Sequence, residues 1–274
     1  MKESRMKIAK WLLLAACALV CCACSKSPLA YVEEDADFIA YLNTGADLDE
    51  NEWKAVQRFM DFKGSCEDVK GFDFWGTDLK LHKAQVAFWY KMKEKDSQYE
   101  IDPNSRRAVI QFEDYPVEKF IGNAAKDHRG AKIEEEEIDG KPAYIFKRDD
   151  TTFMTIIQID SKTAQIFFSK NEPGNVLKAG NDSELAGKID EDVIYATARS
   201  AASLRKEAEL KEKAYKETRK GIKEGDMDKK DKEELKERDI QHKALKFGDE
   251  ITSLYLDGDE LRKETIRDAE EIVD

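Results

Sequence analysis

Cysteines near the amino terminus are the residues whose type and spacing suggest a definite chemistry. Four of them, Cys17, Cys21, Cys22 and Cys24, fall within eight residues, and only Cys66 lies beyond. Four basic residues precede an uncharged run over residues 11–22, which is too short to span a bilayer. A basic start followed by a short apolar run is typical of a secretory signal peptide, here residues 1–23. A thiol at the end of such a peptide is a candidate for covalent lipid attachment.

The residues around Cys24 resemble the lipobox of bacterial lipoproteins. Ala23 is the small residue before the cysteine, and a polar stretch begins at Ser25. The resemblance implies cleavage before Cys24, a diacylglyceryl thioether on its sulfur and an acylated amine. Cys21 is a departure, because the family usually has Leu there. Two or three acyl chains would hold the protein stably on a membrane, whereas one chain alone binds only marginally.

Cys17 is the alternative attachment residue. Residues 14–17 match the family's local pattern better, but the apolar run after Lys10 would then be only six residues long. Cleavage there would also leave three clustered free thiols at an oxidising membrane face. We therefore favour Cys24. An uncleaved apolar anchor is the remaining reading of this stretch.

Charge and cysteine count bound what the rest of the chain can do. The protein has 274 residues and a formal net charge of −12, and removal of residues 1–23 would leave −15. Such an acidic surface disfavours nucleic acid and anionic headgroups as direct partners. With Cys66 as the only thiol after Cys24, no intramolecular disulfide can form, so the fold depends on its own core.

Apolar periodicity predicts a sheet-and-helix domain over residues 36–170, after a tether over residues 24–35. The expected order is a strand at 36–43, a helix from 49, strands at 83–92 and 107–112, a helix starting at Pro116 and a strand at 132–138. Hairpins over 132–147 and 152–169 complete the region. This order matches a ferredoxin-like βαββαβ start, and we predict an α+β fold with helices on one face of an antiparallel sheet.

The region over residues 188–247 predicts a long charged helical hairpin. One helix would run from Ile189 to about residue 220 and a second over 228–246. Between residues 204 and 246, 27 of 43 side chains are charged, with both signs mixed. Such a run is usually a solvated helical face supported by i,i+4 pairs. A protruding hairpin that binds an envelope protein is the functional alternative.

Residues 248–274 predict a β-hairpin followed by an acidic tail. Apolar and polar residues alternate over 251–257, and Gly258 marks the turn into a second strand over 260–267. This hairpin could rejoin the edge of the sheet.

Part of the domain is similar to some uncharacterised bacterial lipoprotein families. The similarity rests on residues 34–43, on residues 108–114 with the helix after them, and on the Asp139-Gly140 hairpin. Those families often begin with a proline, where this chain has Glu33 or Glu34. The resemblance covers residues 31–170 and implies a lipoprotein domain in the cell envelope. It transfers no site residues, because those families have no established activity.

Motifs of common catalytic sites are missing from the sequence. His82, His128 and His242 show no zinc-hydrolase spacing, and no serine lies in an acyl-transfer motif. Acidic neighbours would raise the thiol pKa of Cys66 and so disfavour it as a nucleophile. A protonated His128 at the C-terminal end of the predicted helix would be stabilised by the helix dipole, which is enough to explain a histidine at this position. Residues 134–137, four glutamates, read as an acidic edge strand that discourages aggregation.

Aromatic residues give the sequence its best candidate for a ligand-binding surface. Phe72, Phe74 and Trp75 lie in an irregular segment between two glycines, where an exposed cluster could stack on a sugar. Core packing is the usual role of such residues, and we expect it for Trp53 and Trp89.

Together these features predict a non-enzymatic lipoprotein of the bacterial envelope, on the outer membrane or cell surface, with a binding or assembly role. A surface glycan- or small-ligand-binding lipoprotein is the first alternative, and a hydrolase with unrecognised carboxylates is the second. We predict no cofactor or metal, and no nucleic-acid partner. The predicted partners are the membrane, through the acyl chains, and an envelope protein.

Overall fold

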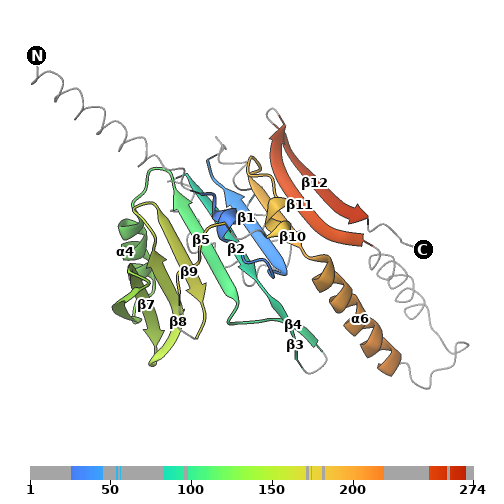
Figure 1. Ribbon diagram of the computed structural model, residues 1–274, viewed down its shortest axis with the longest axis horizontal. Helices are drawn as coiled ribbons and strands as arrows, with labels where there is room; N and C mark the ends of the chain where they lie inside the picture. The colour runs from blue at the N-terminus through green and yellow to red at the C-terminus, as the bar shows by residue number, and fades with distance from the viewer. Residues whose placement is uncertain are drawn as a thin grey trace, which may run out of the picture.

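Ten described strands form one antiparallel sheet in the computed structural model of the protein (Figure 1). The structure describes residues 26–45, 54, 56, 83–95, 98–170, 173, 175–180, 183–218, 247–257 and 260–269. The strands of the sheet are β1 (Phe38–Asn43), β2 (Ala84–Tyr90), β5 (Arg106–Phe112), β6 (Lys132–Ile138), β7 (Lys141–Arg148), β8 (Thr151–Gln158), β9 (Thr163–Phe168), β10 (Tyr195–Arg199), β11 (Phe247–Asp257) and β12 (Glu260–Ala269). A separate small hairpin is made of β3 (Met92–Lys95) and β4 (Gln98–Ile101). The helical elements are η1 (Pro28–Tyr31), α4 (Val117–Asp127), α5 (Glu184–Gly187) and α6 (Ala201–Thr218).

The order of the strands confirms an antiparallel, sheet-rich fold with a few helices and corrects its finer topology. The order is β12-β11-β10-β1-β2-β5-β9-β8-β7-β6, and all neighbours are antiparallel. The expected ferredoxin-like arrangement is wrong, because it would place β1 between β5 and β6, whereas β1 pairs with β2 and β10. Short turns join β6, β7, β8 and β9, so these strands stay adjacent, and β5 pairs with β2 and β9.

The expected hairpins of this region are confirmed. Strands β6 and β7 pair from Lys132↔Lys147 to Ile138↔Lys141, and β8 pairs with β9. Asp139 and Gly140 have φ of 50° and 74°, so the turn needs two left-handed residues. Asp and Gly are the residues that adopt this conformation most readily, which is why the pair predicted the turn.

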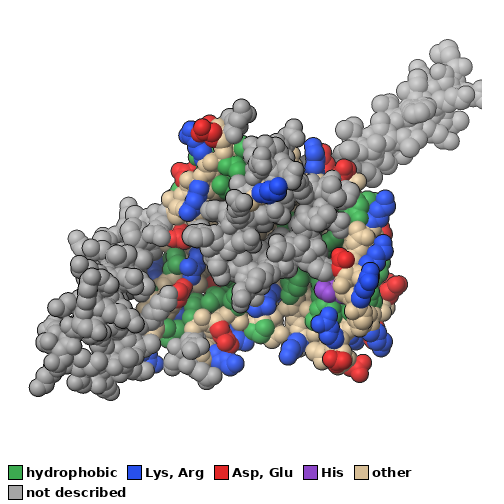
Figure 2. Space-filling view, turned by 180° about the vertical axis from the view of Figure 1, so that it is seen from behind, with side chains coloured by type: hydrophobic (Ala, Val, Ile, Leu, Met, Phe, Trp, Pro, Cys, Tyr) green, Lys and Arg blue, Asp and Glu red, His purple; other side chains and the backbone are tan. Residues whose placement is uncertain are grey.

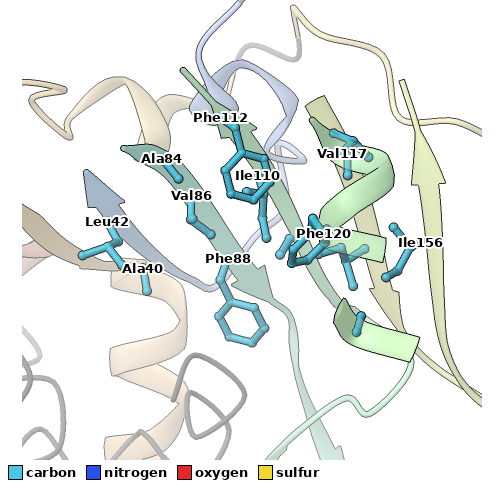
Figure 3. Close-up of a cluster of buried hydrophobic side chains, with 14 of the residues drawn as sticks. Ala40, Leu42, Ala84, Val86, Phe88, Ile110, Phe112, Val117, Phe120 and Ile156 are labelled. Atoms are coloured by element: carbon cyan, nitrogen blue, oxygen red, sulfur yellow. The ribbon is translucent and has the colours of Figure 1, made fainter. Parts of the chain in front are cut away.

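Both faces of the sheet are covered. On the α4 face, Val86, Phe88 and Ile110 belong to one buried cluster with the helix residues Val117 and Phe120 (Figure 3). Helix α4 begins at Val117, one residue later than expected. Pro116 is its N-cap residue and not its first helical residue. The opposite face, which we call the η1 face, packs against η1, α5 and the connection between α5 and β10. Strands buried on two faces need two apolar sides, which explains why the first five residues of β1, Phe38 to Leu42, are all apolar or aromatic.

The prediction of a long helix from Ile189 is wrong, because part of this stretch forms strand β10. Residues 195–199 pair with β1 on one side and β11 on the other, and they are almost entirely buried. Val193, Ile194, Tyr195 and Thr197 are β-branched or aromatic, and this preference outweighs the helical spacing of the same stretch. Among the described residues between 188 and 247, α6 is the only helix, and it begins after Ser200, whose hydroxyl accepts a hydrogen bond from Ser203 N at 3.1 Å. The expected second helix over 228–246 lies outside the described residues.

The carboxyl-terminal hairpin rejoins the sheet as expected. Strands β11 and β12 pair through Asp257↔Glu260, and β11 pairs with β10. The three described strands after residue 170, β10, β11 and β12, therefore belong to the same sheet as β1 and β2. None of the described helices has the length and apolar character needed to cross a membrane.

Candidate functional site

The site residues named from the sequence lie outside the described part of the chain. This holds for Cys24 and its alternative Cys17, and for Phe72, Phe74 and Trp75. Trp89 is described and is fully buried, as expected for a core residue. Within the described residues, no group of three or more His, Cys, Asp and Glu side chains is arranged to hold a metal ion.

His128 is not the helix-end cation that its sequence position suggested. Its ring lies 5.9 Å from the Phe146 ring and 5.1 Å from the Phe153 ring, both edge-on. Burial, and then the nearby Arg148 charge, lower the pKa of His128, while Asp127 raises it less. Neutral imidazole is therefore favoured at pH 7, since the aromatic surroundings offset the helix dipole.

A row of polar side chains crosses the η1 face at one end of the sheet. The strand register places Asn43 beside Gln85, Gln85 beside Gln111 and Gln111 beside Thr163. The next row inward on this face is Tyr41, Ala87 and Val109, all fully buried. The polar row is therefore the point where an apolar core gives way to hydrogen-bonding groups.

The three amides of this row, Asn43, Gln85 and Gln111, line a pocket of about 610 Å³. The lining residues are Ser27, Asn43, Gly45, Lys83, Ala84, Gln85, Gln111, Phe112, Glu113, Lys162 and Glu191, of which eight are polar. The volume is within the roughly 300–1,000 Å³ of small-molecule sites. Its floor is made of paired strands, so the polar groups are held by the most rigid part of the fold.

Backbone hydrogen bonds bring the charged lining residues together on one side. Glu113 N donates to Lys83 O at 3.0 Å, and Phe112 N donates to Lys162 O at 2.9 Å. The Lys162 ammonium also donates to the carbonyl of Glu113. Lys83, Lys162 and Glu113 therefore lie close together, at the edge of the sheet where β2 and β9 begin and β5 ends.

Glu191 supplies a second carboxylate from the β10 side of the pocket. Its carbonyl accepts from Asn43 Nδ2 at 3.1 Å and from the Tyr41 hydroxyl at 3.3 Å. Burial raises the pKa of Tyr41, with smaller contributions from Glu191 and two neighbouring aspartates, so this hydroxyl stays protonated. The loop that carries Glu191 is consequently fixed to β1. With Lys83, Lys162 and Glu113, the pocket has formal charges that sum to zero.

Two local features mark the pocket as more than a gap between strands. The Gln111 Nε2 atom is buried and has no hydrogen-bond partner among the residues that the structure describes. A buried amide nitrogen without a partner costs about 1–3 kcal/mol, so a ligand acceptor that reached it would be favoured. Lys83 has φ of +42°, a left-handed conformation that is unusual for lysine and clusters at functional sites.

A second hollow, of about 860 Å³, lies beside the segment over residues 175–180. Two of its three acidic side chains already have hydrogen-bond partners. Asp139 accepts from Val176 N at 2.8 Å, and Glu33 accepts from Arg107 at 2.9 Å. The first pocket is the better candidate, because Gln111 there still has hydrogen bonds to make.

Sequence reasoning missed the pocket because its residues come from six separate segments. Asn43, Gln85 and Gln111 each stand at a strand end where a turn was expected nearby. The one local signal is that Gln85 and Gln111 lie two residues from the buried Ala87 and Val109, and therefore on the same face of the sheet as these apolar residues. Their alignment into one row depends on the strand register, which the separate strands do not reveal.

Basic and acidic side chains are interspersed over the visible face of the molecule in Figure 2, with no extended patch of one sign. The described part of this face therefore offers no large patch of one sign to attract an oppositely charged partner.

Comparison with known proteins finds only remote likenesses. No protein-family model matches the chain, and no curated protein matches it. Among solved structures, crystal form III of TP0453 covers 87% of this chain and 78% of that chain, with a TM-score of 0.41 and 11% identity. Crystal form IV of TP0453 covers 88% and 80%, with a TM-score of 0.42 and 11% identity. Likenesses this remote carry no information on function and place the chain in no family.

Proposed function

We propose that this protein is a non-enzymatic, lipid-anchored binding protein of the bacterial envelope, and that the pocket lined by Gln111 binds a polar ligand of zero net charge. The observation that carries the proposal is the buried Gln111 Nε2 atom, which has no partner among the described residues and belongs to a side chain that lines a pocket of suitable size. Mixed charges at the rim suit a neutral or zwitterionic solute, because a strongly charged one would leave like charges facing it.

Ligand-observed NMR tests the binding role directly. Saturation transfer from the full, lipid-modified protein in nonionic detergent would be measured to cellobiose, to a dipeptide and to glycerophosphoethanolamine. We expect transfer to at least one solute, weakened about tenfold in Gln111→Leu, since one buried hydrogen bond is worth about that factor. Gln158→Leu is the matched control, because this glutamine lies on β8 and bonds Glu118 at 2.5 Å. Absence of transfer to all three solutes would contradict the proposal.

A carbohydrate is the second candidate ligand. Amide side chains can both donate to and accept from sugar hydroxyls, and three of them stand in one row here. Transfer to cellobiose alone would select this candidate.

Lipid attachment has a test of its own. Cells expressing the protein would be grown with an alkyne-tagged palmitate, and the protein would be probed for the tag. We expect Cys24→Ala to abolish the label and Cys17→Ala to retain it. The reverse result would move the anchor to Cys17, and label on both variants would argue against a lipobox at either cysteine.

A further inference from the structure

The pocket lies close to the point where the chain would leave the membrane. Ser27 lines the pocket, and Cys24 is three residues earlier. Three residues span at most about 10 Å, even when fully extended. A lipid-modified Cys24 would therefore hold the pocket at or just above the headgroup layer, which is about 5–8 Å thick.

Contacts on both sides of η1 fix this short connection to the sheet. Ser27 Oγ accepts from Leu29 N at 3.3 Å, and Gly180 N donates to Ala30 O at 2.8 Å. Further along, the Glu33 carboxylate accepts from Arg107 at 2.9 Å and from Trp89 at 3.2 Å. The segment that follows the anchor is thus part of the folded body, so the pocket cannot swing far from the membrane.

The charges at the pocket rim fit a group that carries both signs. Lys83 and Lys162 are ammonium groups, which bind phosphate as point charges. Glu113 and Glu191 are carboxylates, and both are exposed where they can receive an ammonium. The Gln111 amide would complete the set with a donor to a phosphate or ester oxygen.

We propose that the ligand comes from the anchoring membrane itself: the zwitterionic phosphate-plus-ammonium headgroup of a phospholipid. The inference rests on the proposed function of the pocket and on attachment at Cys24. It gives the protein a second, reversible contact with the membrane beside its covalent one. A chain held by both would keep this end of the sheet against the bilayer.

Calorimetric titration with soluble headgroups separates this proposal from the general one. The probes are glycerophosphoethanolamine, glycerol phosphate, ethanolamine and cellobiose, added to the full lipid-modified protein in nonionic detergent. We expect glycerophosphoethanolamine to bind at least about tenfold more tightly than either half alone, because only it satisfies both signs. Lys83→Asn should weaken that binding about tenfold while keeping the left-handed turn, since Asn tolerates this conformation. Lys119→Asn, an exposed lysine of α4, is the matched control.

The outcomes of this titration are distinct. Binding of cellobiose without glycerophosphoethanolamine would overturn the headgroup proposal and leave the pocket's binding role intact. Binding of none of the probes would overturn the headgroup proposal, and if the dipeptide also shows no saturation transfer, the binding role is overturned as well. Equal binding of glycerol phosphate and glycerophosphoethanolamine would show a plain phosphate site and would also overturn the zwitterion proposal.

Fluorescence quenching tests the predicted position. In a Cys66→Ser background, a dye would be attached at Ser161→Cys, beside Lys162, or at Thr151→Cys, at the other end of β8. Strand β8 spans roughly 25 Å, so the two dyes report opposite ends of the sheet. With the protein anchored in phosphatidylcholine vesicles that contain a headgroup spin label, we expect strong quenching at 161 and weak quenching at 151. Equal quenching, or stronger quenching at 151, would overturn the proposed orientation.

Discussion

Glu33 shows how one side chain joins the amino-terminal segment to the sheet. Its carboxylate accepts from Trp89 and Arg107 and lies 3.5 Å from Lys91. The side chains of Glu33 and Arg107 are only 22% and 21% exposed, so this pair is shielded from water more than a surface ion pair is. Arg107 also stacks over Phe167 at 5.4 Å, and its Nε has no partner. Arg107 therefore depends on Glu33 for the balance of its charge.

Replacing Glu33 with Gln should destabilise the protein. The amide keeps the size of the carboxylate but removes the charge that Arg107 and Lys91 face. We expect the free energy of unfolding to fall by about 1–3 kcal/mol, as for loss of a hydrogen bond to a charged group. Glu34→Gln is the control, because Glu34 is adjacent and exposed. Urea unfolding at pH 7 measures both, and an equal effect of the two variants would contradict this role for Glu33.

His128 makes stability depend on pH in a predictable direction. Burial and Arg148 lower its pKa in the folded state, while the unfolded chain keeps about 6.5. Between these two values the unfolded state binds more protons, so stability should fall as pH drops below 6.5. Above pH 6.5 both states are neutral, and the effect should vanish.

Urea unfolding of the wild type and His128→Gln at pH 7.5 and pH 5.5 tests this prediction. The wild type should lose more stability between the two pH values than the variant does. The difference between the two losses belongs to His128, since carboxylates titrate in both proteins. A variant that loses as much as the wild type would rule out His128 as the source.

At the scale of elements, the sequence predicted best those features that short-range patterns determine. The Asp139-Gly140 hairpin, α4 and the terminal hairpin follow from turn chemistry and periodicity over a few residues. Strand β10 did not, because residues 189–199 have apolar positions compatible with a helix and a strand alike. Its central place between β1 and β11 depends on partners about 50 residues away or more. The pocket was missed for the same reason, since its three amides come together only when β1, β2 and β5 are in register.

Glycine substitutions give a paired test of the turn and of the helix. Gly140→Ala should cost about 1–2 kcal/mol of stability, because a side chain at φ of 74° is strained. Gly122→Ala, within α4, should instead stabilise by up to about 1 kcal/mol, since a Cβ there meets no atom within 4 Å. Thermal unfolding monitored by circular dichroism shows whether each variant is less or more stable than the wild type. A stabilising Gly140→Ala would mean that the turn differs from the one described.

At the scale of the whole molecule, an open sheet leaves two strands at its edges. Among the described strands these are β6 and β12. Unpaired backbone groups along an edge can recruit another chain, and charged side chains oppose this. Three consecutive residues of β6, Glu135, Glu136 and Glu137, are exposed, which agrees with the acidic edge strand expected from the sequence. On β12 the charges are of mixed sign, and Ile266 is 51% exposed.

Removing the charges of β6 should therefore promote self-association. In the triple variant Glu135→Thr, Glu136→Thr and Glu137→Thr, the new residues favour strand structure, so the edge should persist without its repulsion. We expect sedimentation velocity to show oligomers at protein concentrations at which the wild type shows none. The control changes net charge equally away from the edges, with Glu184→Gln, Asp190→Asn and Asp192→Asn. If the control associates as strongly, total charge rather than the edge strand keeps the chains apart. If neither variant associates, the β6 glutamates do not guard the edge.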